Sequence, residues 1–254
     1  MVPGGVVGLM TAPVFVAGPD ALTVGPVVLD GPEGRHAVSV RRLRPGERIV
    51  LTDGEGTGAY ATVTSVSGKD RLEAEVEHVR TEPDPRPRLT VVQALPKGDR
   101  GELAVETMTE TGVDVIVPWA AARCVTQWRG ERGTKSLAKW RTTAREAGKQ
   151  SRRLRFPRVE DLVTSRQLAQ RLTGAAFAAV LHGDGGASLA GAELPADGEI
   201  VLVVGPEGGI TQEELDAFAD AGAEPYRLGP SVLRTSTAGT AASALLLGRS
   251  GRWS

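Results

Sequence analysis

The sequence predicts two domains: a small β-barrel, followed by an α/β domain built on a mostly parallel sheet. Short β-like segments with glycine-rich turns fill the first third of the chain. A linker with three prolines, RTEPDPRPR at residues 80–88, follows them. Beyond the linker, apolar strands alternate with helical stretches, the pattern of a parallel sheet covered by helices. The chain has 254 residues, 41% of them hydrophobic, which is enough for two cores.

The first domain is expected to span residues 12–82. Residues 10–18, MTAPVFVAG, predict a leading strand, and we expect residues 1–11 to form a disordered extension. Three further strands are predicted within residues 47–79, where DGEGTG and SGKD supply the turns between them. Several short strands so close together in the sequence favour a small barrel.

The second domain is expected to span residues 88–252. Gly112 ends its first helix, because glycine tolerates the left-handed conformation that follows many helices. Thr211 and Glu214 match a capping box at the start of another helix. The predicted strands occupy residues 89–95, 113–118, 122–127, 176–181, 200–204 and 225–228. The other predicted helices occupy residues 98–112, 134–148 and 236–247.

Composition excludes several kinds of protein. The single cysteine, Cys124, excludes an internal disulfide and fits a reducing cytoplasm. The three histidines are scattered, and no metal-ligand spacing is present. No apolar run approaches the roughly 18 residues of a membrane span, and no Lys or Arg precedes the apolar first residues as in a signal peptide. We therefore expect a cytoplasmic protein that uses neither a metal nor a membrane.

Positive charge is concentrated in two stretches, although the net charge is only −1. Residues 129–158 hold eleven Lys or Arg and two Glu, and residues 35–48 hold five Arg and one Glu. Concentrated positive charge on a nearly neutral protein is typical of surfaces that bind phosphates. The alternative is that these side chains only form solvated helix faces.

Three glycine-containing segments follow predicted strands: residues 180–186 (VLHGDGG), 203–209 (VVGPEGG) and 227–239 (RLGPSVLRTSTAG). In open α/β sheets, ligands bind at the carboxyl ends of the strands, so these segments predict a ligand site. The alternative for VVGPEGG is a plain turn between a strand and a helix. The chain has neither GxGxxG after a strand nor GxxxxGK followed by Ser or Thr, which argues against the common dinucleotide and nucleoside triphosphate sites. Local motifs suggest no Ser-His-Asp triad.

Two of these segments resemble the signature of the RsmE-type family, SPOUT-superfamily methyltransferases that act on small-subunit ribosomal RNA. They are GPEGGITQEE at residues 205–214 and LGPSVLRTSTA at residues 228–238. Four more blocks are similar to the family and occur in its order: HAVSVRRLRPGERIVLTDG, QALPKGDR, ETGVDVIVPWAAARCV and AREAGKQSRRLRFPRV. The resemblance covers about residues 12–249.

The resemblance implies a PUA-like N-terminal β-barrel and a C-terminal SPOUT domain with a deep trefoil knot. It also implies a homodimer that uses S-adenosylmethionine to methylate N3 of one uridine in 16S ribosomal RNA. The expected partner is small-subunit ribosomal RNA or the 30S particle. Two alternatives stay open: a non-catalytic RNA-binding assembly factor on the same fold, and transfer RNA ribose methylation, which would need a different knot signature.

The resemblance places the cofactor pocket in the three strand-end segments, where glycines would let the cofactor approach the backbone. Glu207 would either hydrogen-bond cofactor hydroxyls or brace its own loop. The expected cofactor-binding residues are Leu181, His182, Gly183, Gly205, Pro206, Glu207, Gly208, Gly209, Leu228, Gly229, Val232, Leu233, Arg234 and Ser236.

Arg234 is the expected catalytic residue. N3 of uracil must lose a proton to become a better nucleophile, and a nearby cation stabilises the developing anion. The alternative is that Arg234 bonds to backbone carbonyls and pins the knot. The family commonly has Leu-Arg-Thr-Glu-Thr-Ala where this chain has Leu-Arg-Thr-Ser-Thr-Ala, so Ser236 replaces a glutamate and no general base is assigned. Ser236 would alternatively cap the last helix.

The basic stretches supply the expected RNA contacts, and the target base is expected to be unpaired or flipped. Trp128 and Trp140 flank the basic helix, where each would either stack on a base or pack in the core. The expected RNA-binding residues are Arg41, Arg42, Arg44, Lys97, Arg100, Lys149, Gln150, Arg152 and Arg153.

Overall fold

The computed structural model describes residues 12–253, which divide into two compact units. The first unit comprises the described residues up to Pro83 together with Gly148–Phe156. The second unit comprises Asp84–Ala147 and the described residues from Pro157 onward. The extension expected at residues 1–11 lies outside the described residues.

The first unit is built on a five-stranded mixed sheet in the order β1-β3-β4-β5-β2. β1 runs parallel to β3, and the other neighbours are antiparallel. β3, β4 and β5 confirm the three strands predicted within residues 47–79, and β1 confirms the leading strand. The strands are β1 (Val14–Val16), β2 (Gly25–Leu29), β3 (Arg48–Thr52), β4 (Thr57–Ser67) and β5 (Arg71–Thr81). Short helical segments occupy Pro19–Ala21, Gly31–Arg35 (α1) and His36–Val40.

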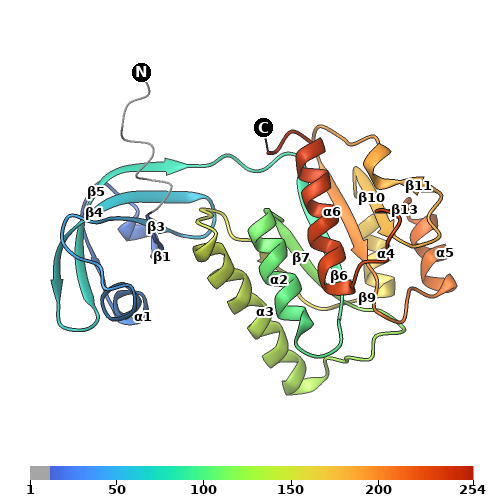
Figure 1. Ribbon diagram of the computed structural model, residues 1–254, viewed down its shortest axis with the longest axis horizontal. Helices are drawn as coiled ribbons and strands as arrows, with labels where there is room; N and C mark the ends of the chain where they lie inside the picture. Colours follow the sequence, from blue (N-terminus) through green and yellow to red (C-terminus); the bar gives the residue numbers. More distant parts are fainter. Residues whose placement is uncertain (1–11, 254) are drawn as a thin grey trace. The chain divides into compact units, whose positions relative to one another are not determined.

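Alternating side chains of these strands form two clusters. Ile49 and Leu51 are fully buried in the main core of the unit. Val50, between them, belongs to a second cluster that contains Leu154. The long β4–β5 pair, visible in Figure 1, turns at Gly68, whose φ of 63° favours glycine.

Leu154 comes from the segment Gly148–Phe156, which packs with the first unit. The Leu154 carbonyl accepts hydrogen bonds from the Gly56 N–H at 3.0 Å and from the Thr52 hydroxyl at 2.9 Å. The Phe156 N–H donates to the Gly54 carbonyl at 2.7 Å. Dividing the sequence at the proline-rich linker alone does not predict that residues 148–156 belong to the first unit.

The second unit is built on an eight-stranded parallel sheet with the path β11-β13-β10-β12-β6-β7-β8, and β9 also pairs with β7. This confirms the α/β class and the parallel sheet. The strands are β6 (Arg88–Ala94), β7 (Val115–Ala120), β8 (Arg158–Val159), β9 (Val163–Thr164), β10 (Phe177–Leu181), β11 (Ala187–Ser188), β12 (Glu199–Val204) and β13 (Glu224–Arg227). The helices are α2 (Arg100–Thr111), α3 (Gly130–Gln150), α4 (Ser165–Leu172), α5 (Gln212–Asp220) and α6 (Thr235–Arg249), with a short turn at Leu189–Gly191.

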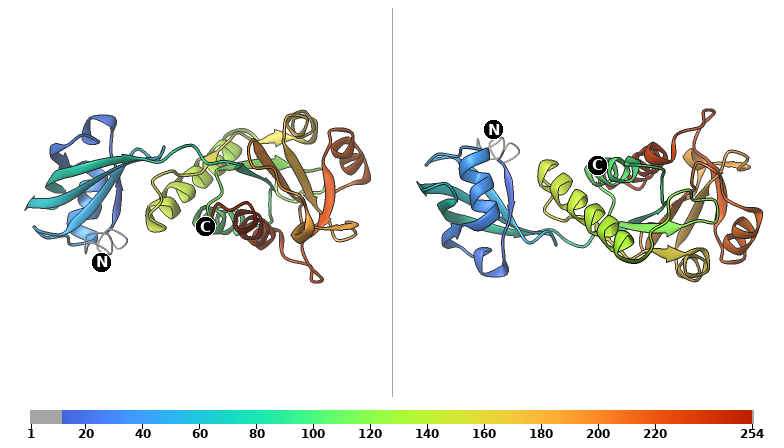
Figure 2. Two further views of the ribbon diagram at one scale, coloured as in Figure 1. Left: turned by 90° about the horizontal axis from the view of Figure 1, so that it is seen from above. Right: turned by 90° about the horizontal axis from the view of Figure 1, so that it is seen from below.

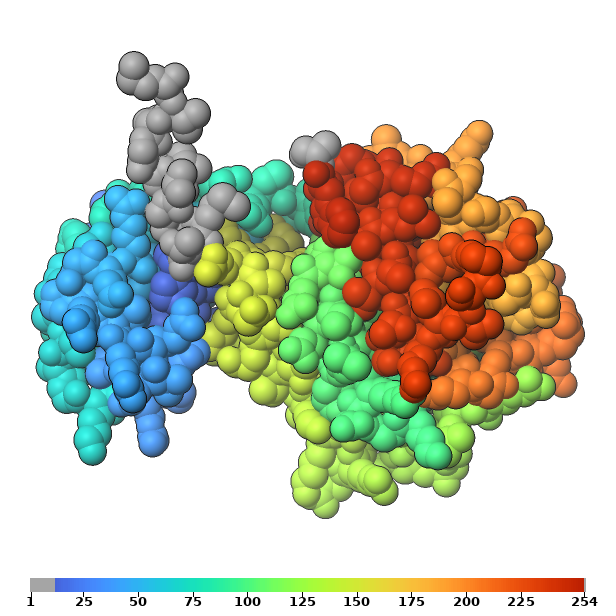
Figure 3. All heavy atoms as spheres, viewed as in Figure 1, coloured from blue at the N-terminus to red at the C-terminus, as the bar shows by residue number. Residues whose placement is uncertain are grey.

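Helices cover both faces of this sheet. α6 packs on β6 and β12, whereas α4 lies on the opposite face beside α5 (Figure 2). α2 lies against α6, and Figure 3 shows the two side by side on the surface of the unit. The Thr107 and Thr240 hydroxyls, 2.6 Å apart, join these helices. Gly239 lets them approach closely, because a Cβ there would lie 2.9 Å from Met108 Sδ.

The element predictions hold for most of this unit and fail at a few places. Gly112 ends α2 with φ of 111°, and the Thr211–Glu214 capping box begins α5, as predicted. The strand predicted at residues 122–127 is wrong, because the Cys124 N–H turns back to the Ala121 carbonyl at 3.0 Å and the segment is a loop. The strand predicted at residues 225–228 lies one residue earlier in the structure.

Two helices also differ from the prediction. α3 begins four residues before and ends two residues after the helix predicted at residues 134–148. α4 was not predicted from the sequence, although Thr164 and Gln167 form a full capping box at its start.

Candidate active site

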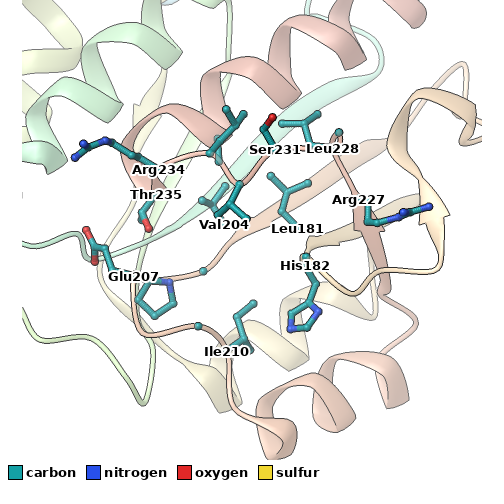
Figure 4. A pocket seen from close by; sticks show the side chains of 18 of the residues that line it. Leu181, His182, Val204, Glu207, Ile210, Arg227, Leu228, Ser231, Arg234 and Thr235 are labelled. Atoms are coloured by element: carbon teal, nitrogen blue, oxygen red, sulfur yellow. The ribbon is translucent and has the colours of Figure 1, made fainter.

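A pocket of about 500 Å³ lies at the carboxyl ends of three neighbouring strands, β12, β10 and β13. Parallel pairing aligns these ends: Leu181 at the end of β10 pairs with Val204 at the end of β12 and with Tyr226 on β13. The segments that follow the three strands therefore meet around one space (Figure 4). Volumes of this size are usual for small-molecule sites.

The structure brings the predicted cofactor-binding residues together around this pocket, with two exceptions, Gly208 and Ser236. It also adds residues that the sequence analysis did not assign to the pocket. Two of them, Thr235 and Ala238, lie in the first turn of α6, at the end of the third segment. The additional lining residues are Arg100, Val204, Ile210, Arg227, Pro230, Ser231, Thr235 and Ala238.

The glycines after β12 have structural reasons within the protein. A Cβ on Gly205 would come within 2.7 Å of Ile210 Cγ1, and one on Gly208 within 3.1 Å of the Arg123 carbonyl oxygen. Gly209 has φ of 77°, which favours glycine. The loop itself therefore needs glycine at these three positions. The Arg123 guanidinium also donates to the Gly208 carbonyl, at 3.2 Å.

Glu207 braces the same loop. Its Oε1 accepts a hydrogen bond from the Lys97 N–H at 3.2 Å. This bond joins the GPEGG loop to the loop between β6 and α2. Of the two roles left open for Glu207, the structure displays the bracing one, while the exposed carboxylate still lines the pocket.

The segment after β10 is fixed to its neighbour by backbone bonds. The His182 N–H donates to the Tyr226 carbonyl at 3.0 Å, and the His182 carbonyl accepts from the Gly185 N–H at 3.2 Å. The ring takes part as well, because His182 Nδ1 accepts from the Asp184 N–H at 3.3 Å. His182 therefore shapes this wall of the pocket.

The third segment ends at the start of α6. Arg234 is the N-cap residue, and its carbonyl accepts from the N–H groups of Thr237 and Ala238, both at 2.9 Å. Ser236 is the second residue of the helix and is buried, so the alternative that it caps the helix is wrong, because the N-cap residue is Arg234. Gln93, buried at the end of β6, donates from its Nε2 to the Thr235 carbonyl at 3.3 Å. This bond holds the beginning of α6 beside the sheet.

The Arg234 guanidinium is exposed and lines the pocket. Among residues 12–253 it has no hydrogen bond to a backbone carbonyl, so the pinning role is not seen. Figure 4 places Arg234 and Glu207 on one side of the pocket and His182 and Arg227 on the other.

Glu214 organises the region behind the GPEGG loop. Its Oε1 accepts from the Ser165 hydroxyl at 2.6 Å and from the Ala122 N–H at 2.8 Å, and its Oε2 accepts from the Thr211 N–H at 3.1 Å. Ser165 in turn accepts from Trp119 Nε1 at 3.1 Å. Burial raises the pKa of Glu214, but these hydrogen bonds outweigh burial and hold the pKa below its ordinary value. The charged carboxylate thus ties α4, α5 and the end of β7 together.

The predicted RNA-binding residues differ in their surroundings. Lys149 is corrected: it is buried, and its Nζ lies 2.8 Å from Glu33 Oε1 within the first unit. A buried, paired ammonium is not available to an RNA phosphate. Arg41, Arg42, Arg44, Lys97, Gln150 and Arg152 are exposed, and Arg100 and Arg153 are half-buried.

Trp128 and Trp140 pack edge to face with ring centroids 4.9 Å apart. Trp140 is buried and Trp128 is half-buried. Cys124 is buried, and burial raises the pKa of its thiol, in keeping with a small apolar residue. Within the described part of the chain, no group of three or more His, Cys, Asp or Glu could hold a metal ion, and no helix could cross a membrane.

Comparisons with known proteins show which family this chain resembles. The chain matches two family models, an RNA methyltransferase domain over residues 82–247 and an RNA methyltransferase PUA domain over residues 29–77. It is 46% identical over 230 residues to the ribosomal RNA small subunit methyltransferase E of Mycobacterium bovis. The aligned residues cover 89% of this chain and 87% of that protein. The protein of the same name from Bacillus subtilis is 31% identical over 218 residues, or 83% of this chain and 85% of its own.

Solved structures agree in fold. A ribosomal RNA small subunit methyltransferase E from Neisseria gonorrhoeae, bound to S-adenosyl methionine, superposes with a TM-score of 0.82 at 32% identity, over 94% of this chain and 98% of that chain. A Legionella pneumophila methyltransferase in complex with the cofactor SAM superposes with a TM-score of 0.82 at 25% identity, again over 94% of this chain and 98% of that chain. The chain therefore belongs to the ribosomal RNA small subunit methyltransferase E (RsmE) family.

Proposed function

We propose that this protein transfers the methyl group of S-adenosylmethionine to N3 of one uridine in small-subunit (16S) ribosomal RNA. The observation that carries the proposal is the meeting of the three strand-end segments around one pocket of about 500 Å³. The two sequence blocks that resemble the RsmE family follow β12 and β13, two of the three strands at this pocket. No observation favours transfer RNA ribose methylation.

The pocket fits S-adenosylmethionine in size and in the character of its walls. At Gly183 and Gly229, an added Cβ would meet no atom within 4 Å, so both glycines border open space. Apolar walls come from Leu181, Val204 and Leu228. The backbone of the third segment would bond the adenine edge, and Glu207 would accept from ribose hydroxyls in addition to bracing its loop. The expected cofactor contacts at Gly208 and Ser236 would be indirect, through Arg123 and α6.

Arg234 is proposed as the catalytic residue. S-adenosylmethionine supplies an electrophilic methyl group, and most of the catalysis of its displacement is positioning. N3 of uracil loses its proton as it becomes the nucleophile. The guanidinium of Arg234, exposed at the pocket, would stabilise the negative charge that develops on the base. Ser236 is buried inside α6, so it offers no group to the reacting base.

The RNA would be held through its phosphates, with the target uridine unpaired or flipped out of a helix. Lys97 and Arg100 belong to the loop and helix start beside the pocket, and they would hold phosphates next to the target. The exposed arginines at residues 41–44 of the first unit, with Gln150, Arg152 and Arg153, would extend the contact along the RNA.

The proposal includes finer features of the assembly. Residues 12–82 would form a PUA-like β-barrel, and residues 88–252 a SPOUT domain with a deep trefoil knot. Family membership supports both features, together with the packing of α6 against β6 and β12. The protein would act in the cytoplasm as a homodimer on 16S RNA or the 30S particle, without a metal.

Labelled S-adenosylmethionine tests the reaction. The protein is incubated with small ribosomal subunits from a strain that lacks the enzyme, with naked ribosomal RNA and with transfer RNA, and the product nucleosides are identified by mass spectrometry. We expect 3-methyluridine in the small-subunit RNA. A labelled ribose in transfer RNA would contradict the proposal, and binding of subunits with no transfer to any RNA would favour the assembly-factor alternative.

A further inference from the structure

A second cavity, of about 440 Å³, lies in the second unit apart from the cofactor pocket and shares no lining residue with it. Its walls come from the loop after β6, the first turn of α2, the loop after β7 and the beginning of α3. The Thr126 hydroxyl donates to the Pro96 carbonyl at 2.7 Å and so fixes two of these walls to each other. The lining residues with side chains of interest are Glu102, Gln127, Trp128, Arg132, Ser136 and Trp140.

The aromatic wall of this cavity is held in place from behind. Trp140 is buried against Gly101, where an added Cβ would lie 2.7 Å from the indole. The half-buried Trp128 packs edge to face on Trp140, with ring centroids 4.9 Å apart. The Trp128 indole is therefore fixed in orientation and still partly accessible at the cavity. A fixed, accessible indole is a surface on which an unpaired base stacks.

The other walls supply polar groups suited to the edge of a base. Gln127 is exposed, and its amide can both donate and accept hydrogen bonds. Ser136 adds a hydroxyl, which can do the same. The carboxylate of Glu102 is already paired with Lys139 at 3.2 Å, which reduces its repulsion of RNA.

Two arginines lie at or next to the cavity in the chain. Arg132 lines it, and Arg129 lies just before α3. Both are exposed, and neither makes a salt bridge with another residue of the described chain. Cations next to an aromatic surface suit a nucleotide, whose base stacks while its phosphate is neutralised.

The cavity lies beside the proposed active site. Pro96 and Gly98 line the cavity, and Lys97 between them donates its N–H to Glu207 in the cofactor pocket at 3.2 Å. In the same way Arg100 lines the cofactor pocket, whereas the next residue, Gly101, lines the cavity. One short loop therefore separates the two spaces.

We propose that this second cavity binds an unpaired nucleobase of the RNA substrate, close to the methylated uridine, by stacking on Trp128 and by hydrogen bonds to Gln127. The inference rests on the proposed function, because that function supplies the RNA and the target position. The cavity would thus choose the target uridine through its neighbour in sequence.

The test measures binding of unmethylated small ribosomal subunits and binding of S-adenosylmethionine, each with the full-length protein. We expect Trp128→Ala to weaken subunit binding about 10- to 100-fold, Trp128→Phe to stay close to wild type, and Gln127→Ala to weaken it by a smaller factor. S-adenosylmethionine affinity should not change. Leu103→Ala is the matched control, because Leu103 is exposed on α2 and lines neither cavity.

Ser136→Phe is a second variant that tests the cavity even if Trp128→Ala misfolds. It fills the cavity and leaves both tryptophans in place. It should weaken subunit binding as Trp128→Ala does. Ultraviolet cross-linking should attach the RNA to a peptide that contains Trp128, even if no methyl transfer is found. Methyl transfer with normal subunit binding by Trp128→Ala and Ser136→Phe would overturn the cavity proposal alone. Absence of transfer by the wild type, with the cross-link present, would overturn the proposed reaction but support the cavity.

Discussion

At the scale of single residues, the carboxylate of Glu214 joins α4, α5 and the segment after β7. The groups that bond to its carboxylate are all donors: the hydroxyls of Ser165 and Thr211 and the N–H groups of Ala122 and Thr211. Glu214→Gln replaces one acceptor oxygen with an NH₂ that faces donors. We expect it to lower the free energy of unfolding by about 1–3 kcal/mol, measured by urea denaturation. Glu213→Gln, a neighbouring exposed residue, makes the same charge change and should have little effect.

The same carboxylate gives stability a pH dependence. Its pKa is lowered in the folded protein, so its contribution is complete above the unfolded pKa of about 4.3. The contribution is lost as the pH falls through the folded pKa. The difference in stability between wild type and Glu214→Gln should therefore narrow in acid. A difference that grows below pH 4 would contradict this account.

Arg234 is the residue at which the chemistry is tested most sharply. Arg234→Ala should lower kcat by about 100-fold or more, because it removes the cation that stabilises the developing anion. Arg234→Lys should restore part of the rate. Methyl transfer is measured at saturating cofactor and RNA, and Arg166→Ala, an exposed arginine on α4, serves as the control. A fall in RNA affinity with unchanged kcat would assign Arg234 to binding instead.

At the scale of elements, the start of α6 at the active site depends on how closely α6 approaches α2. Gly239 faces Met108, and a Cβ there would lie 2.9 Å from its sulfur. Gly239→Val should therefore destabilise the protein by about 1–3 kcal/mol through overpacking. Gly248 lies in the same helix, where an added Cβ would meet nothing within 4 Å, so Gly248→Val should be nearly neutral. Thermal unfolding of the two variants measures the difference. Equal losses of stability in Gly239→Val and Gly248→Val would contradict the prediction.

Elements with a local signal could be predicted from the sequence. The apolar run at residues 200–204 and the capping box of Thr211 and Glu214 suffice for β12 and α5. The segment at residues 122–127 looked like a strand because it is short and partly apolar. Its structure is instead set by distant partners, such as the Pro96 carbonyl that bonds Thr126. A local sequence pattern does not reveal a hydrogen-bond partner that is distant in the chain.

The same contrast holds within the site. The three glycine-containing segments could be predicted because each directly follows a strand that the sequence predicts. The roles of Arg123 and Gln93 were missed, because they depend on contacts with Gly208 and Thr235 that are remote in sequence. Charge was the least reliable guide: Lys149 lies in the most basic stretch of the chain, yet it is buried against Glu33.

At the scale of the whole molecule, the chain leaves the second unit after Ala147, returns to the first unit at Gly148–Phe156 and then completes the second. The Lys149–Glu33 ion pair is part of this return, with side chains only 7% and 14% exposed. Lys149→Met would leave the Glu33 carboxylate buried without this cation, and we expect a loss of about 3 kcal/mol in unfolding free energy. Gln150→Ala, at the exposed neighbouring residue, should leave the free energy of unfolding nearly unchanged. Unchanged stability with weaker RNA binding would instead restore Lys149 as an RNA contact.

The central claim is that the pocket formed by the three strand-end segments binds S-adenosylmethionine. Calorimetric titration of the cofactor into the wild type and into Gly229→Val tests it most directly. Gly229 lines the pocket and an added Cβ meets no atom within 4 Å, so valine should occupy cofactor space without disturbing the fold. Gly186→Val is the control, because Gly186 is equally open but does not line the pocket. We predict one cofactor bound per wild-type chain, at least 10-fold weaker binding to Gly229→Val and normal binding to Gly186→Val, whereas no binding to the wild type, or equal binding to all three, would contradict the account.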